Sequence, residues 1–286
     1  RAARLLFILR GSVMFFRFLI VILLSCLSVS ANANAPEQVA SDVISDWEDW
    51  MARHRIPAGA IIVTYNGEVV GEGGIARSVD EPAKVASLSK AITAVCALHA
   101  LEQSGMAPTA ALSSVLPSAL AEHPPRDDRF ADITVEQLIT HASGIDTDYH
   151  RSELSKLRTF TVENKLWQFS KVANEQLSGT PAWASYRYAN ANYLVLGLVI
   201  EELTGEDYEP YCQREGLEAI GITTAQLNPD WRVMTSWCGW EISARDYLTF
   251  ALANFTQENT PLRPAGIILS ASDVGRGRGY GAGIVF

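Results

Sequence analysis

The sequence has little positive charge. Its 286 residues include 23 Lys and Arg against 32 Asp and Glu, a formal net charge of −9. The first 33 residues hold four Arg and no acidic residue, so the remainder carries 19 basic against 32 acidic residues, a net charge of −13. A chain this acidic repels phosphate backbones, which argues against nucleic acid as a partner.

Two common functional motifs are also missing. No G-x-S-x-G elbow occurs, which disfavours an α/β-hydrolase. No glycine-rich loop precedes a helix in the arrangement that binds phosphate. With 48% apolar and 19% charged residues, the chain is instead typical of a globular protein with one large core or two modest ones.

Cysteine is scarce, with four residues in the whole chain. Cys26 lies in an N-terminal apolar stretch, and Cys96 lies in an apolar helical pattern that predicts a buried thiol. A bridge between Cys212 and Cys238 is open as an alternative in an oxidising compartment, because spacing alone does not fix the pairing.

The N-terminus resembles an export signal. One basic residue follows Met14, residues 18–24 are apolar, and Ala31-Asn32-Ala33 fits a signal-peptidase site. We therefore expect residues 1–35 to be a signal peptide with upstream residues, and the mature protein to be periplasmic or secreted. A membrane anchor and lipidation at Cys26 stay open, and they are the two routes by which we expect membrane contact.

The hydrophobic pattern predicts an α/β fold, with an antiparallel sheet flanked by helices. The α/β domain is expected at 36–106 plus 236–286, with a mainly helical domain inserted at 107–235. Asn66-Gly67 predicts a hairpin turn, and Thr134 to Gln137 predicts a capping box. The predicted helices are 36–54, 87–103, 134 to about Gly144, 193–203 and 244–254, and the predicted strands are 58–65, 68–75 and 280–286.

The first chemical motif is Ser87-Leu88-Ser89-Lys90, an S-x-x-K pattern. A spacing of three on a helix places Ser87 and Lys90 on one face, so the amine can lie beside the hydroxyl. A serine hydroxyl is a weak nucleophile until a base takes its proton. A lysine serves as that base only when burial or positive potential lowers its pKa, and the first turn of an apolar helix supplies both. The alternative is a surface lysine in a fraying first turn.

The second motif is Tyr188-Ala189-Asn190. Residues i and i+2 of an extended segment point the same way, so a phenol and an amide would project together. The phenol could exchange a proton with the serine and the leaving group. The alternative is a loop tyrosine with Asn190 as an N-cap, and both descriptions can hold for Asn190.

Five ordered segments together resemble the serine β-lactamase, DD-peptidase and esterase superfamily, on the class C side. The segments are Lys84-Val85-Ala86-Ser87-Leu88-Ser89-Lys90-Ala91, Leu138-Ile139-Thr140-His141-Ala142-Ser143-Gly144-Ile145, residues 186–205 with Tyr188-Ala189-Asn190, Gly239-Trp240-Glu241-Ile242-Ser243-Ala244-Arg245-Asp246, and Gly279-Tyr280-Gly281-Ala282-Gly283.

The resemblance implies a role for each matched residue. Ser87 would be the acylated nucleophile, Lys90 its base partner, Tyr188 a second acid/base, and Asn190 a contact for the substrate amide. His141 matches a position that is structural in the family, and as a metal ligand it has only His150 nearby in sequence, so we expect no metal and no organic cofactor.

The family's third motif, K-T-G or H-x-G, is not found after residue 246, where residues 275–279 form a glycine-rich loop pattern. We therefore expect the chain to stop before the last strands and helix of the fold, and to be unstable or inactive alone. The first functional hypothesis is an exported serine hydrolase acting on a β-lactam, a D-Ala-D-Ala peptide of peptidoglycan or an ester. The second is a non-catalytic scaffold or binding protein with the same fold.

Overall fold

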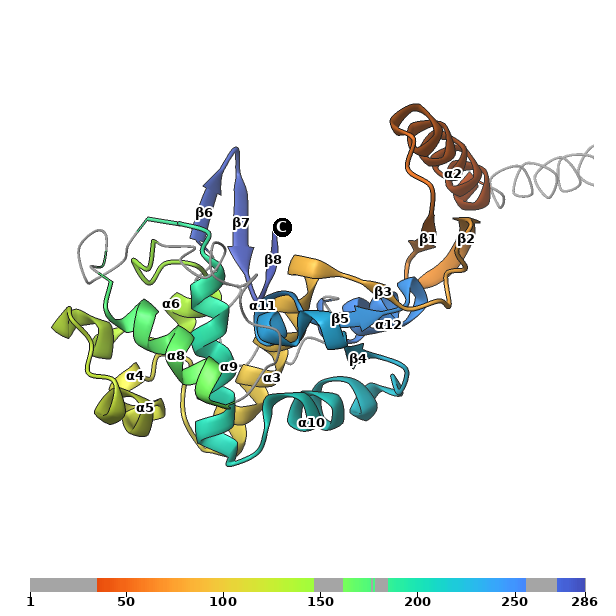
Figure 1. Cartoon of the computed structure of the whole chain (residues 1–286). Helices are drawn as coiled ribbons and strands as arrows, with labels where there is room; N and C mark the ends of the chain where they lie inside the picture. Colours follow the sequence, from red (N-terminus) through yellow and green to blue (C-terminus); the bar gives the residue numbers. More distant parts are fainter. Residues whose placement is uncertain (1–34, 147–161, 176, 178–184, 256–271, 286) are drawn as a thin grey trace, which may run out of the picture. The chain divides into compact units, whose positions relative to one another are not determined.

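A computed structural model describes residues 35–146, 162–175, 177, 185–255 and 272–285 (Figure 1). The predicted signal segment, with Cys26, and His150 lie outside these residues. The chain forms two compact units, one up to Val79 and the other from Asp80. The domain boundaries expected near residues 107 and 235 stay a prediction. Among the described helices, none combines the length and the hydropathy needed to cross a membrane.

The first unit is a helix followed by a hairpin, as the sequence predicts. Helix α2 spans Ala35–His54, and strands β1 (Gly59–Tyr65) and β2 (Glu68–Ile75) pair antiparallel. The turn residues Asn66 and Gly67 have φ of 52° and 85°. Two consecutive positive φ angles are typical of the turn that an Asn-Gly pair favours between antiparallel strands.

The second unit is organised around two buried helices, α3 (Ser89–Gln103) and α9 (Asn190–Thr204). Both are apolar on most faces, which is expected of helices inside a core. The short helix α11 (Thr235–Cys238) packs against both of them. The other α-helices in the described part of the unit are α4 (Leu112–Val115), α5 (Pro117–Glu122), α6 (Val135–Ile139), α8 (Val162–Ala173), α10 (Tyr208–Cys212) and α12 (Ala244–Phe255).

Among the described residues of this unit, the structure also has two small antiparallel sheets. The first has the order β3-β5-β4, and the second has the order β6-β7-β8. The predicted α/β class, with antiparallel pairing and flanking helices, is confirmed. The strands are β3 (Ala83–Lys84), β4 (Gln226–Leu227), β5 (Trp240–Ile242), β6 (Ser272–Gly275), β7 (Arg278–Gly281) and β8 (Ile284–Val285).

Local signals placed several helix ends correctly. Thr134 and Gln137 form the predicted capping box at the start of α6, and Gly205 ends α9 with φ 69°. Helix α6 is shorter than predicted, because it ends at Ile139 and the chain turns at His141, where φ is 57°. A positive φ cannot continue a right-handed helix.

The C-terminal segment also differs from the prediction. Residues 280–286 were expected to form one strand, but Ala282 and Gly283 have φ of 51° and 83° and reverse the chain between β7 and β8. The glycine-rich pattern at 275–279 is a tight hairpin turn with strand on both sides, not a longer loop. Alternating glycines masked the strand pattern, because glycine has no side chain to give a period of two.

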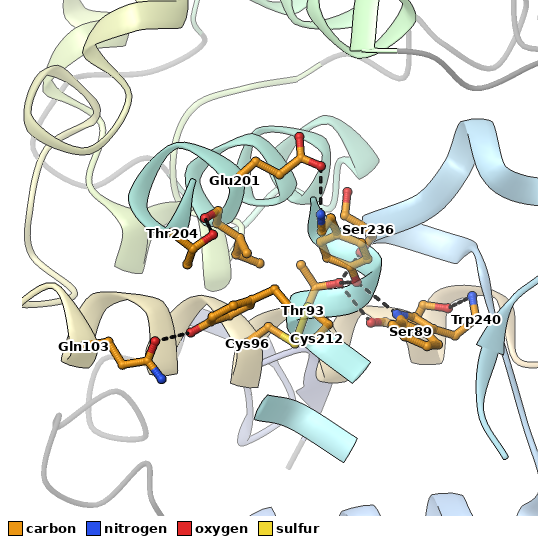
Figure 2. Close-up of a disulfide and its surroundings, with 12 residues drawn as sticks. Ser89, Thr93, Cys96, Gln103, Glu201, Thr204, Cys212, Ser236 and Trp240 are labelled. Atoms are coloured by element: carbon orange, nitrogen blue, oxygen red, sulfur yellow. Dashed lines mark hydrogen bonds between the residues drawn. A yellow bond between two sulfur atoms is a disulfide. The ribbon is translucent and has the colours of Figure 1, made fainter. Parts of the chain in front are cut away.

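The cysteine prediction was wrong. Cys96 is not a buried thiol: it forms a disulfide with Cys212, which joins the middle of α3 to the end of α10 (Figure 2). Both cysteines are fully buried, and Cys238 is not part of the bridge. The pairing links residues 116 positions apart, so no local pattern could reveal it.

Replacing both Cys96 and Cys212 with Ala is expected to lower the free energy of unfolding by about 3–4 kcal/mol, because the bridge closes a loop of 116 residues and restricts the unfolded chain. Denaturant unfolding under non-reducing conditions measures this change. Cys238→Ala is the matched control, and an equal loss there would contradict the assignment of the bridge.

Candidate active site

Ser87 sits at the entrance to α3. It lies in the single 3-10 turn Ala86–Leu88, between β3 and the helix, and its side chain is exposed. Ala86 has φ 48°, a left-handed conformation that costs an alanine roughly 1–2 kcal/mol. The strained turn places the serine hydroxyl at the surface while the helix behind it is buried.

Lys90 lies three residues further on, completely buried. Its ammonium donates to three neutral oxygens, Ser87 Oγ at 3.3 Å, Asn190 Oδ1 at 2.8 Å and the Trp237 carbonyl at 2.8 Å. The helical spacing of three accounts for the first contact, and α9 and α11 supply the other two. The lysine is therefore held in place with its nitrogen against the serine.

Tyr188 approaches Ser87 from the segment that precedes α9. Its hydroxyl donates to Ser87 Oγ at 2.9 Å, and the Lys90 nitrogen lies 5.0 Å from the centre of its ring. Ala189 is extended, with φ −140° and ψ 128°, so Tyr188 and Asn190 project to the same side as predicted. Tyr188 keeps 41% of its surface exposed, which leaves the pair of hydroxyls open to solvent.

The structure thus brings together all four residues that the sequence singled out. Ser87 and Lys90 come from the start of α3, and Tyr188 and Asn190 come from the start of α9, about a hundred positions away. An exposed hydroxyl beside a buried amine and a phenol is an arrangement that can form and release a covalent ester.

His141 lies beneath Tyr188, with the two ring centres 4.5 Å apart. Burial, and secondly the charge of Lys90, lower the pKa of His141 to about 3. An imidazole that stays neutral at working pH is in keeping with a structural role beneath Tyr188. Among the described residues, no group of three His, Cys, Asp or Glu side chains is arranged to hold a metal ion.

Sequence reasoning missed a buried hydrogen-bond chain behind Lys90. The Trp240 indole donates to the Tyr208 hydroxyl at 2.9 Å, and that hydroxyl lies 2.6 Å from Thr93 Oγ1. Thr93 Oγ1 in turn donates to the Ser236 carbonyl at 2.5 Å, and Figure 2 labels Thr93, Ser236 and Trp240 in this region. The chain fixes the backbone next to Trp237, whose carbonyl binds Lys90. The sequence signal was a lone threonine in an apolar helix, which is too weak to assign a partner.

Comparisons with known proteins identify the family of the chain. Residues 44–277 match the family model described as Beta-lactamase. "Protein flp" of Staphylococcus aureus (strain COL) is 25% identical over 183 residues, which cover 60% of this chain and 35% of that protein. The chain therefore spans about a third of that relative's length.

Two solved structures are similar in fold. EstCE1, titled a hydrolase with promiscuous acyltransferase activity, has a TM-score of 0.70 at 16% identity and covers 87% of this chain and 83% of its own. A D-stereospecific amidohydrolase from Streptomyces sp. has a TM-score of 0.66 at 21% identity, covering 80% and 78%. At these identities the likeness concerns the fold.

Proposed function

The chain belongs to the Beta-lactamase family, and its fold is similar to those of solved hydrolases. From that premise we propose that it is a serine hydrolase acting through an acyl-enzyme on Ser87. One observation carries the proposal: Ser87 Oγ lies 2.9 Å from the Tyr188 hydroxyl and 3.3 Å from the Lys90 nitrogen. Either neighbour can accept the serine proton when it is in its unprotonated form.

In the proposed first half-reaction, Ser87 Oγ attacks a substrate carbonyl carbon. Its proton passes to Lys90 or Tyr188, and a C–O bond forms. The tetrahedral intermediate collapses, the bond to the leaving nitrogen or oxygen breaks, and the leaving group takes the proton. Water then attacks the Ser87 ester in the second half-reaction, which releases the acid and returns the proton to the serine.

Asn190 and the Ser87 backbone have binding roles in this proposal. Asn190 Oδ1 already accepts from Lys90, and we assign its amide nitrogen to the substrate carbonyl or amide oxygen. The backbone N–H of Ser87 serves as one hydrogen-bond donor to the negatively charged oxygen of the tetrahedral intermediate. Backbone N–H groups commonly stabilise such an oxyanion.

The substrate class proposed is a β-lactam, a D-Ala-D-Ala peptide or a simple ester, which all present a carbonyl to a serine nucleophile. We further propose that the protein works outside the cytoplasm, in the periplasm or secreted. The buried Cys96–Cys212 disulfide supports this location, because such bridges persist in oxidising compartments.

A covalent probe tests the proposal directly. The complete protein is incubated with a fluorophosphonate or a penicillin and digested, and its peptides are analysed by mass spectrometry. We expect one adduct, on the peptide that contains Ser87, and complete loss of it in Ser87→Ala.

Ser114→Ala is the matched control, because Ser114 is an exposed serine of α4 and should leave labelling intact. Persistent labelling of Ser87→Ala would contradict the proposal. Reversible ligand binding without any adduct would favour the non-catalytic scaffold instead.

A further inference from the structure

Four tyrosines surround His141. Its ring centre lies 4.5 Å from that of Tyr188, 4.7 Å from Tyr280, 5.2 Å from Tyr193 and 6.0 Å from Tyr186. Tyr193 and Tyr280 are buried, whereas Tyr188 is 41% exposed. The His141 imidazole therefore packs against the buried side of the Tyr188 ring.

His141 also holds the backbone on both sides of Tyr188. The N–H of Arg187 donates to the His141 carbonyl at 2.9 Å, and the N–H of Ala189 points at its Nδ1 at 3.4 Å. The left-handed φ of 57° at His141 turns its carbonyl and its ring toward the same segment. A displacement of His141 would thus move Tyr188 through two neighbouring contacts.

The hydrogen bonds around the ring determine its tautomer. Asn192 Nδ2 donates to Nδ1 at 2.9 Å, and the Asn192 amide is oriented by the Ser143 hydroxyl, which donates to its Oδ1 at 2.5 Å. Because Nδ1 accepts, the proton is on Nε2, which donates to the Tyr280 hydroxyl at 3.1 Å.

The neighbouring Tyr193 has a partner of its own, because its hydroxyl donates to the Ile139 carbonyl at 2.9 Å. Burial raises the pKa of Tyr280 and of Tyr193 well above the ordinary tyrosine value. Both phenols therefore keep their protons, and the bond from His141 Nε2 to the Tyr280 hydroxyl keeps its direction across the working pH range.

We propose that Tyr280, acting through the neutral imidazole of His141, is a positioning residue for Tyr188. The inference rests on the proposed acylation of Ser87 and deepens it. It assigns to strand β7, through Tyr280, a role in positioning the Tyr188 phenol. The Tyr280 ring also lies near the Tyr188 ring, with the ring centres 6.3 Å apart and the planes nearly perpendicular, and its hydroxyl acts through the bond to His141 Nε2.

Tyr280→Phe tests this with the smallest change, since it removes one hydroxyl and keeps the ring. We expect the maximal rate of Ser87 acylation by a fluorophosphonate to fall by roughly 10–100-fold, because a small misplacement of an acid/base group is that costly. The probe concentration at half-maximal rate should change less than twofold.

Tyr211→Phe is the matched control. Tyr211 is equally buried, and its hydroxyl donates to Gln103 Oε1 at 3.1 Å, at the far end of α3. It should lose a similar amount of thermal stability with an unchanged acylation rate. His141→Asn, which tolerates the positive φ but deletes the ring, should lower the rate further.

A second readout does not need activity. With ¹³C-labelled tyrosine, the ring signal of Tyr188, assigned by its absence in Tyr188→Phe, should shift or broaden in Tyr280→Phe and stay unchanged in Tyr211→Phe. If the probe does not label the parent protein, the acylation proposal fails. The Tyr188 ring signal still tests whether Tyr280 positions Tyr188. An unchanged Tyr188 signal in Tyr280→Phe would overturn the inference, as would an unchanged acylation rate in a chain that labels normally.

Discussion

Lys90→Met is expected to lower the rate of Ser87 acylation by about 10³-fold while the chain stays folded, since general acid–base groups contribute about 10²–10⁴-fold. Methionine has a similar length and no charge, so the substitution removes the proton acceptor from a site that is completely buried. It leaves the Asn190 Oδ1 and the Trp237 carbonyl without one donor, which costs about 1–3 kcal/mol for a buried acceptor. Relief of the buried charge offsets part of that cost.

Lys165 offers a matched control for this substitution. It is also buried, and it pairs with Glu201 on α9. Lys165→Met leaves the partly buried Glu201 carboxylate with the Tyr208 N–H as a donor but without its ammonium partner, and loss of a hydrogen bond to a charged group costs about 1.5–3 kcal/mol. We therefore expect the two variants to separate: Lys90→Met loses rate with a modest change in stability, and Lys165→Met loses stability with little change in rate.

The measurements are the pseudo-first-order rate of probe labelling and the free energy of unfolding in denaturant. Lys90→Arg adds a useful third case, because a guanidinium keeps the charge but does not give up its proton. A rate in Lys90→Met within tenfold of the parent would contradict a role for Lys90 in proton transfer.

Much of the site could be predicted from the sequence because its geometry is local on each side. The spacing of three in Ser87 and Lys90 is set by a helix, and the spacing of two in Tyr188 and Asn190 is set by an extended residue. Elements with a strong terminal signal, such as the Asn66-Gly67 turn, were predicted for the same reason. Local patterns determine local geometry.

The parts that could not be predicted depend on contacts between distant residues. The Cys96–Cys212 bridge spans 116 positions, and the contact of His141 with Tyr280 spans 139. The left-handed φ of Ala86 has no local sequence signature, because alanine ordinarily avoids that conformation. It exists because β3 and α3 are both held by tertiary packing, which over-determines the turn between them.

Gly283→Ala is expected to disrupt both the fold of the hairpin and the site. A Cβ on Gly283 would lie 2.4 Å from the Ala91 nitrogen and 2.6 Å from the Lys90 carbonyl carbon, inside the backbone of α3. Backbone atoms of a buried helix cannot move aside as a flexible side chain can, so the turn between β7 and β8 must shift. The shift would carry Tyr280 away from His141, and we expect acylation of Ser87 to fall by about 10²-fold or more.

Gly277→Ala separates the steric contact from the backbone conformation. Gly277 has φ 70° in the β6–β7 turn, close to the 83° of Gly283, and a Cβ there would meet nothing within 4 Å. That variant should lose only the left-handed penalty, roughly 1–2 kcal/mol of unfolding free energy, and keep its acylation rate. Gly283→Ala should lose at least about 2 kcal/mol more, because an overpacked contact adds to the same penalty. The prediction would be contradicted if both variants lost the same unfolding free energy and had the same acylation rate. The close approach of Gly283 to α3 would then not hold the β7–β8 hairpin in place.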